Sequence, residues 1–138
     1  MGNELASYQV SLKVLLKKDG VYLFLRDAES GFFDLPGGRI NRDERNVPLE
    51  KILQREIAEE IGGNVQYKID KPAFQYRASK DGQDIFITVY EAEYFSGEIV
   101  LSPDHNNIVW VDPKSFDTLK EPFLSQEGYA ALINYFKK

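Results

Sequence analysis

The chain has 138 residues, no cysteine, one histidine and a formal net charge of −5. A chain of this length typically forms one domain, so we expect a single domain over residues 1–138. The absence of cysteine excludes disulfides, zinc–thiolate sites and thiol nucleophiles. The negative charge disfavours a nucleic-acid polymer as partner, because the chain repels a phosphate backbone. A small phosphorylated substrate stays open if a bound cation supplies positive charge.

The apolar stretches of the chain are all too short to span a bilayer. The first nine residues lack the basic region and apolar run of a secretory signal. We therefore expect a cytoplasmic protein without a membrane partner. The sequence does not determine the oligomeric state, and a homodimer stays open.

Short extended segments precede the centre of the chain. The turn signal Asp19-Gly20 predicts a hairpin between the first two of them. Pro36 ends the third, because proline cannot donate to a central ladder. The pair Gly37-Gly38 permits backbone shapes that residues with a Cβ avoid. The predicted extended segments are residues 9–17, 21–26 and 32–35, and a polar loop follows at 41–47.

A central amphipathic helix is predicted by apolar residues that recur every four positions. Pro48 suits the first turn of this helix, and Gly62-Gly63 provides a C-terminal stop. The recurring residues are Leu49, Leu53, Ile57 and Ile61.

The second half of the chain is mostly extended and closes with a helix. Ile85, Ile87 and Val89 alternate with residues that point the other way, as in a strand. Many strands with two helices predict a mixed β-sheet with helices packed on its faces, an α/β (α+β) class of fold. The remaining predicted elements are strands at 65–69, 73–78, 85–94 and 108–111, a helical turn at 112–116 and a helix at 125–137.

Three glutamates of the central helix, Glu56, Glu59 and Glu60, fall within an arc of roughly 100° that borders its aliphatic stripe. Like charges this close repel each other, and a divalent cation relieves that repulsion. Carboxylate oxygens suit Mg²⁺ or Mn²⁺. The alternative is a solvated acidic face, which is common on helices.

The glycine pair and the helix together resemble the Nudix box. The first half of the box is matched by Gly38 and, after five residues, Glu44. The second half is matched by Arg55-Glu56-Ile57, Glu59-Glu60 and Gly62. Two departures stand out: the segment between Glu44 and Arg55 is three residues longer than usual, and Gly63 replaces an aliphatic residue. We expect the insertion to enlarge the loop before the helix, at 45–48.

The resemblance implies a Nudix-like α/β/α sandwich and a metal-dependent hydrolase. Such an enzyme cleaves the diphosphate bond of a nucleoside diphosphate linked to another moiety, by attack of water at phosphorus. Glu56, Glu59, Glu60 and the carbonyl of Gly38 would hold Mg²⁺, with Mn²⁺ as the alternative ion. The implied catalytic residues are Glu56, Glu59 and Arg55: either glutamate would act as general base, and Arg55 would orient a glutamate.

Residues outside the helix are further candidates, each with a plainer alternative. Glu44 and Glu93 are possible additional carboxylates, although Glu93 also fits a surface charge at a strand end. Arg26 is a candidate for phosphate contact, and Phe33 lies either near the substrate base or in the core. His105 falls in a polar loop, 104–107, that caps the site or is simply solvated.

Three other functions compete with the hydrolase. A non-catalytic Nudix-fold module would bind a nucleotide and regulate a partner, but such proteins tend to lose box glutamates. Isomerisation of allylic diphosphates on a related fold usually calls for a cysteine, which is absent. A helical interaction module with a solvated acidic patch would show no response to metal. We expect substrate selectivity to lie in loops at 28–33, 80–84 and 102–107.

Overall fold

The computed structural model describes residues 3–118, 122–123 and 125–138. Two helices, α1 (Leu49–Ile61) and α2 (Gln126–Phe136), accompany the strands, and short 3-10 turns occur at Arg42–Glu44 and Pro113–Thr118. No helix in these ranges is long and apolar enough to cross a membrane. The strands are β1 (Gln9–Lys18), β2 (Val21–Asp27), β3 (Phe33–Asp34), β4 (Gly37–Arg39), β5 (Gln66–Lys80), β6 (Gln83–Ser96) and β7 (His105–Val111).

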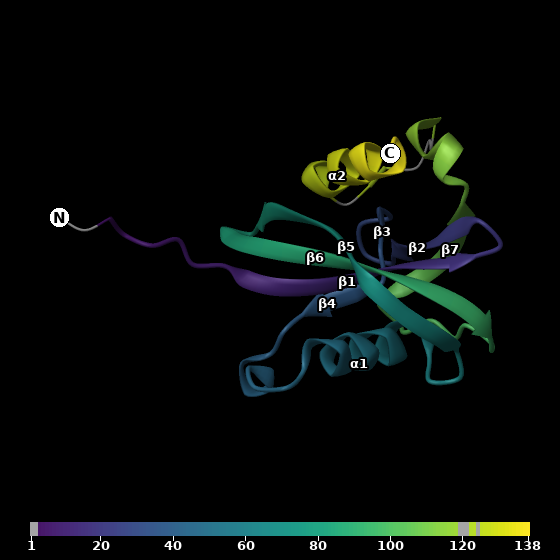
Figure 1. Cartoon of the computed structure of the whole chain (residues 1–138), viewed down its shortest axis with the longest axis horizontal. Coiled ribbons are helices and arrows are strands. Elements are labelled where there is room, and N and C mark those ends of the chain that lie inside the picture. Colours follow the sequence, from purple (N-terminus) through teal and green to yellow (C-terminus); the bar gives the residue numbers. More distant parts are fainter. Residues whose placement is uncertain (1–2, 119–121, 124) are drawn as a thin grey trace.

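The strands form one mixed sheet that lies between the two helices. Its order is β3-β2-β1-β6-β5, with β4 paired to β1 and β7 paired to β2. Strands β1 and β6 are parallel, and the other pairs are antiparallel. Figure 1 shows α1 and α2 on opposite sides of the sheet. The predicted α/β/α sandwich with a mixed sheet is confirmed.

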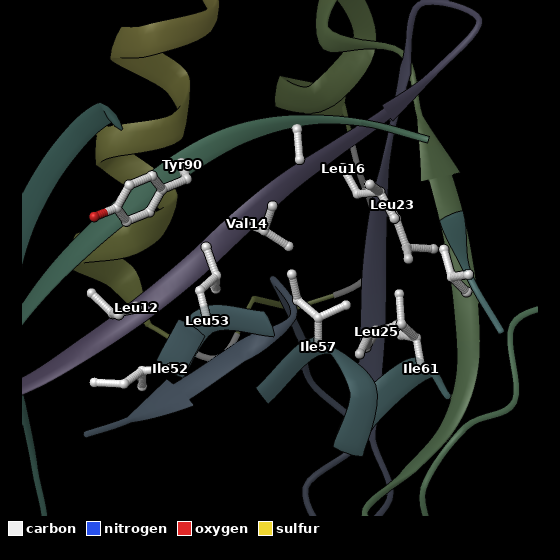
Figure 2. Close-up of a cluster of buried hydrophobic side chains, with 12 residues drawn as sticks. Leu12, Val14, Leu16, Leu23, Leu25, Ile52, Leu53, Ile57, Ile61 and Tyr90 are labelled. Atoms are coloured by element: carbon white, nitrogen blue, oxygen red, sulfur yellow. The ribbon is translucent and has the colours of Figure 1, made fainter. Parts of the chain in front are cut away.

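Two apolar clusters hold the layers together, and β1 contributes to both. Leu12, Val14 and Leu16 face the α1 side, whereas Leu15 faces the α2 side. This follows from the alternation of side chains along a strand. On the α1 side, Figure 2 shows the aliphatic stripe of the helix directed at the sheet. The fully buried residues of that stripe are Ile52, Leu53, Ile57 and Ile61.

Two predictions about the extended segments are wrong in part. The two strands expected at 65–69 and 73–78 are one strand, β5, whose pairing with β6 shifts register between Ile69 and Phe74. The loop expected at 104–107 is mostly strand, because β7 begins at His105 and pairs with Asp27 of β2. The alternation of apolar residues there is too short to reveal a strand that continues through polar residues.

We predict that Leu53→Ala lowers the free energy of unfolding by about 2–5 kcal/mol, because it opens a cavity in the α1-side core. Leu49 begins the same helix but is exposed, so Leu49→Ala should change stability by no more than about 0.5 kcal/mol. Urea unfolding of both variants measures the difference. Equal losses would show that α1 does not pack as described.

Candidate active site

The three glutamates of α1 lie in different environments. Glu56 is buried, with 8% of the residue exposed. Glu60 is half-buried, and its carboxylate accepts a hydrogen bond of 2.7 Å from the backbone N–H of Gly37. Glu59 has 58% of its side chain exposed. The helix therefore directs two carboxylates inward, toward the glycine pair, and leaves the third in solvent.

The glycine pair makes room for the buried carboxylates. Gly37 has φ +147°, and a Cβ there would lie 2.1 Å from the carbonyl oxygen of Leu12. A Cβ on Gly38 would lie 2.2 Å from Oε2 of Glu56. The carboxylate of Glu56 thus occupies the space that any other side chain at position 38 would fill. The carbonyl of Gly38 accepts a hydrogen bond of 3.2 Å from the hydroxyl of Ser11.

Arg55 joins three carboxylates around its guanidinium. It donates to both oxygens of Glu44, at 2.5 and 2.6 Å. It also contacts Oε1 of Glu56 at 2.8 Å and both oxygens of Glu59 at 3.1 and 3.2 Å. The bidentate geometry is the strong form of this interaction. The position of Arg55 therefore suits the expected role, which is to orient a glutamate of the helix.

The three-residue insertion does not remove Glu44 from the site. Glu44 ends the 3-10 turn Arg42–Glu44, and its carboxylate accepts from the backbone N–H of Asn41 at 2.9 Å. The hydrogen bonds from Arg55 and Asn41 hold the pKa of Glu44 below its usual value. The extra length lies between Glu44 and α1.

Burial dominates the electrostatics of the inward-facing glutamates. Desolvation raises the pKa of Glu60 to about 7, against the opposing effects of the Gly37 hydrogen bond and of Lys13. Desolvation also raises the pKa of Glu56, and Arg55 opposes that change. Ionisation of these two neighbouring carboxylates is unfavourable, so this part of the site lacks the positive charge that would neutralise them.

Lys13 of β1 and Asp34 of β3 form an ion pair of 2.7 Å next to these carboxylates. Burial by itself lowers the pKa of Lys13, but Asp34, Tyr76 and Glu60 together outweigh burial, so the pKa is raised and the ammonium stays charged. His105 also lies near Glu60, with Nε2 3.9 Å from Oε2 of Glu60. Its Nδ1 is buried and has no hydrogen-bond partner among the described residues.

Two cavities open beside this arrangement. The first, about 430 Å³, lies between the sheet and the start of α2, and its apolar wall includes Tyr76, Ile85 and Ile87. The second, about 530 Å³, is polar and is lined by Gly37, Glu60 and His105 among others. The residues that line both cavities are Lys13, Asp34 and Lys80.

Three predicted site residues lie away from the glutamates. Arg26 donates to Asn106 at 3.0 Å and lines neither of the two cavities. Phe33 is buried in the α2-side core, which was one of the two expectations for it. Glu93 pairs in register with Lys17, four residues beyond Lys13 along β1, and is therefore roughly 13 Å farther along the sheet. Glu93 is exposed there.

The residues present fit a hard divalent cation. Glu56 offers a buried carboxylate and Glu60 a half-buried one, and the space at Gly38 brings its backbone alongside the first of them. Within the described ranges, no three acidic or histidine side chains converge closely enough to enclose a metal by themselves. The fit therefore rests on the two carboxylates and the adjacent backbone; a Mg²⁺ ion would keep several waters and commonly takes further oxygens from substrate phosphates.

Sequence reasoning missed Lys13, Asp34, Tyr76 and the N-terminal turn of α2. A signal for Lys13 exists, because it is a charged residue at an inward-facing position between apolar neighbours of β1. The loops at 28–33, 80–84 and 102–107 do contribute to the polar cavity, through Ala28, Lys80 and Asp104. The contribution of α2 to the other cavity depends on how the chain ends pack, which spacing does not reveal.

The whole fold is similar to solved Nudix structures. A MutT protein from Methanosarcina mazei Go1 matches with TM-score 0.77 and 25% identity, over 95% of this chain and 96% of that one. A MutT NUDIX hydrolase from Burkholderia pseudomallei matches with TM-score 0.71 and 26% identity, over 93% and 98%. These matches support membership of the Nudix hydrolase family. The expectation of a Nudix-type enzyme is confirmed at the level of the family.

Solved structures of lower sequence identity show only that the fold is shared. An ADP-ribose pyrophosphatase from Streptococcus suis 89-1591 matches with TM-score 0.69 and 13% identity, over 95% of this chain and 91% of that one. No family sequence model and no curated protein sequence matches the chain. The Nudix assignment therefore depends on the fold together with the box residues.

We predict that the metal-free protein loses stability as pH rises toward 7, because of Glu60. Its folded pKa of about 7 exceeds the unfolded value of 4.5. The protonated form therefore stabilises the fold fully below pH 4.5, and this contribution is lost as pH rises through 7. Urea unfolding with a chelator, from pH 5 to 8.5, should show a smaller dependence on pH for Glu60→Gln than for wild type. Parallel profiles for the two proteins would contradict the burial described for Glu60.

We also predict that Gly38→Ala removes divalent-metal binding while the fold persists, because the added methyl group collides with the Glu56 carboxylate. Isothermal titration with MnCl₂ measures the loss, and circular dichroism checks the fold. Gly63→Ala is the matched control, since a Cβ there would meet no atom within 4 Å. Unchanged Mn²⁺ affinity in Gly38→Ala would contradict the close approach of Glu56.

Proposed function

We propose that the protein is a divalent-metal-dependent hydrolase that cleaves the diphosphate bond of a nucleoside diphosphate linked to another moiety. The observation that carries this proposal is the buried carboxylate of Glu56 and the half-buried carboxylate of Glu60 against the Gly37-Gly38 backbone. They lie beside a polar cavity that continues past Lys13 into a partly apolar one. A cation bound there would attract phosphates to an otherwise acidic surface.

Each residue has a role that follows from its position. Glu56, Glu60 and the carbonyl of Gly38 are the proposed metal ligands, with Mg²⁺ as the ion and Mn²⁺ as its substitute. When bound, the ion lowers the pKa of water and stabilises charge on phosphoryl oxygens. Arg55 holds Glu56 in place through their 2.8 Å contact. Glu59, exposed to solvent, and Glu56 are the two candidates for the general base that accepts the proton of the attacking water.

The two cavities suggest which part of a substrate binds in each of them. The cavity beside α2 has an apolar wall and polar groups at its rim, including Gln126 and Glu127. These features suit the organic part of a ligand, with polar groups that orient it. The polar cavity beside Glu60 suits the phosphates. An ADP-ribose pyrophosphatase shares the fold, which is consistent with this class of substrate.

We predict that Glu56→Gln and Glu60→Gln each reduce diphosphatase activity at least about a hundredfold, because each removes a proposed metal ligand. Glu50→Gln, an exposed change in the first turn of α1, is the matched control and should leave the rate unchanged. Far-ultraviolet circular dichroism checks that the variants fold. Wild-type turnover in both site variants would refute the proposed ligands.

A release assay tests the activity itself. The purified protein is incubated with a panel of nucleoside diphosphate derivatives and with Mg²⁺ or Mn²⁺, and nucleoside monophosphate is measured. We expect release that depends on the ion and is abolished by a chelator. Silence across the panel, together with tight binding of the same compounds, would instead favour a non-catalytic nucleotide-binding module.

A further inference from the structure

Lys13 is a charged residue on the face of the sheet that packs against α2. It alternates along β1 with residues of the α1-side core, so its side chain lies on the α2 side together with Leu15. Only 14% of the Lys13 side chain is exposed, and the same fraction of its partner Asp34. A buried ion pair is weak evidence of stabilisation, because its desolvation cost is about as large as its attraction. A role in ligand binding explains its position better.

The ammonium of Lys13 is held in place before any ligand arrives. Oδ2 of Asp34 accepts from Nζ of Lys13 at 2.7 Å, and Oδ1 accepts from the backbone N–H of Leu35 at 2.7 Å. Both oxygens of the carboxylate are therefore engaged, one by the backbone and one by the lysine. A lysine ammonium has three donors, and Asp34 takes one of those of Lys13. Two remain for a ligand, and Asp34 of β3 fixes the position of the ammonium.

The position of Lys13 is the junction of the two cavities. Lys13 lines both of them, and Glu60 is close enough to contribute to its electrostatics. Lys80 also lines both cavities, but it is exposed and lies at the end of β5. Among the described lysines that line the two cavities, Lys13 is thus the one that is mostly buried and held by an ion pair, between the proposed places for the phosphates and for the organic group.

We propose that Lys13, positioned by Asp34, binds the diphosphate of the substrate directly and determines the affinity for it. This inference rests on the proposed function, since it places the phosphates at the junction of the two cavities. Arg55 is engaged with three carboxylates, so its guanidinium has few donors left for a phosphate. A charge-assisted contact from a buried ammonium is stronger than one from an exposed group.

The test measures binding of methylenediphosphonate, a diphosphate without a base that resists hydrolysis, in the presence of Mg²⁺. Isothermal titration is performed on wild type, Lys13→Met and Lys13→Arg. We expect Lys13→Met to weaken binding about tenfold or more, as for the loss of a charge-assisted hydrogen bond. Lys13→Arg should retain most of the affinity. Lys17→Met is the matched control on the same strand, exposed and near Glu93, and should bind as wild type does.

Two further measurements, MnCl₂ titration and thermal unfolding, accompany the binding test. MnCl₂ titration without phosphonate should still show Mn²⁺ binding in Lys13→Met, which separates loss of the anion contact from loss of the metal site. If Lys13→Met does not fold, Lys13→Gln replaces it, and thermal unfolding decides which variant is used. Binding of methylenediphosphonate that is equal in wild type and in the neutral variant overturns the proposal. Failure of wild type to hydrolyse any substrate would refute the proposed function, but this binding measurement does not depend on turnover.

Discussion

The close approach of Glu56 to Gly38 is the contact on which the site depends. The carboxylate lies where a Cβ at position 38 would be, so the helix and the backbone before it meet without an intervening side chain. Gly37 adds a second link, because its N–H donates to Glu60. These two contacts bring two carboxylates of one helix against one stretch of backbone. Packing of α1 on the sheet sets their depth, since the aliphatic stripe of the helix is fully buried.

This arrangement leaves an excess of negative charge, which other residues of the site partly neutralise. Burial makes ionisation of Glu56 and Glu60 costly. Arg55 compensates Glu44, Glu56 and Glu59 from one side, and Lys13 lies near Glu60 on the other, where it is engaged with Asp34. The remaining deficit of positive charge is what a divalent ion would supply. A bound divalent ion, together with Lys13, would give this acidic chain the positive charge that a phosphorylated ligand needs.

The helical part of the site was predictable because it is local. A spacing of three and four residues places side chains on one side of any helix, and the same rule predicted α1 itself. The burial of Glu56 and the exposure of Glu59 were not predictable, since they depend on how far α1 is rotated against the sheet. The distance of Glu93 from the site was not predictable either, because it depends on the register between β6 and β1.

The sequence by itself determined the amphipathic helix, its carboxylates, the glycine pair and the mixed class of fold, because these follow from periodicity and from motifs within short segments. Only the tertiary structure decided which carboxylates are buried, that Glu44 reaches Arg55 despite the insertion, and that His105 opens a strand beside Glu60. The ion pair of Lys13 and Asp34 joins residues 21 positions apart on strands that are not neighbours in the sheet. Its place between two cavities arises from the packing of α2 over the sheet, which no local pattern encodes.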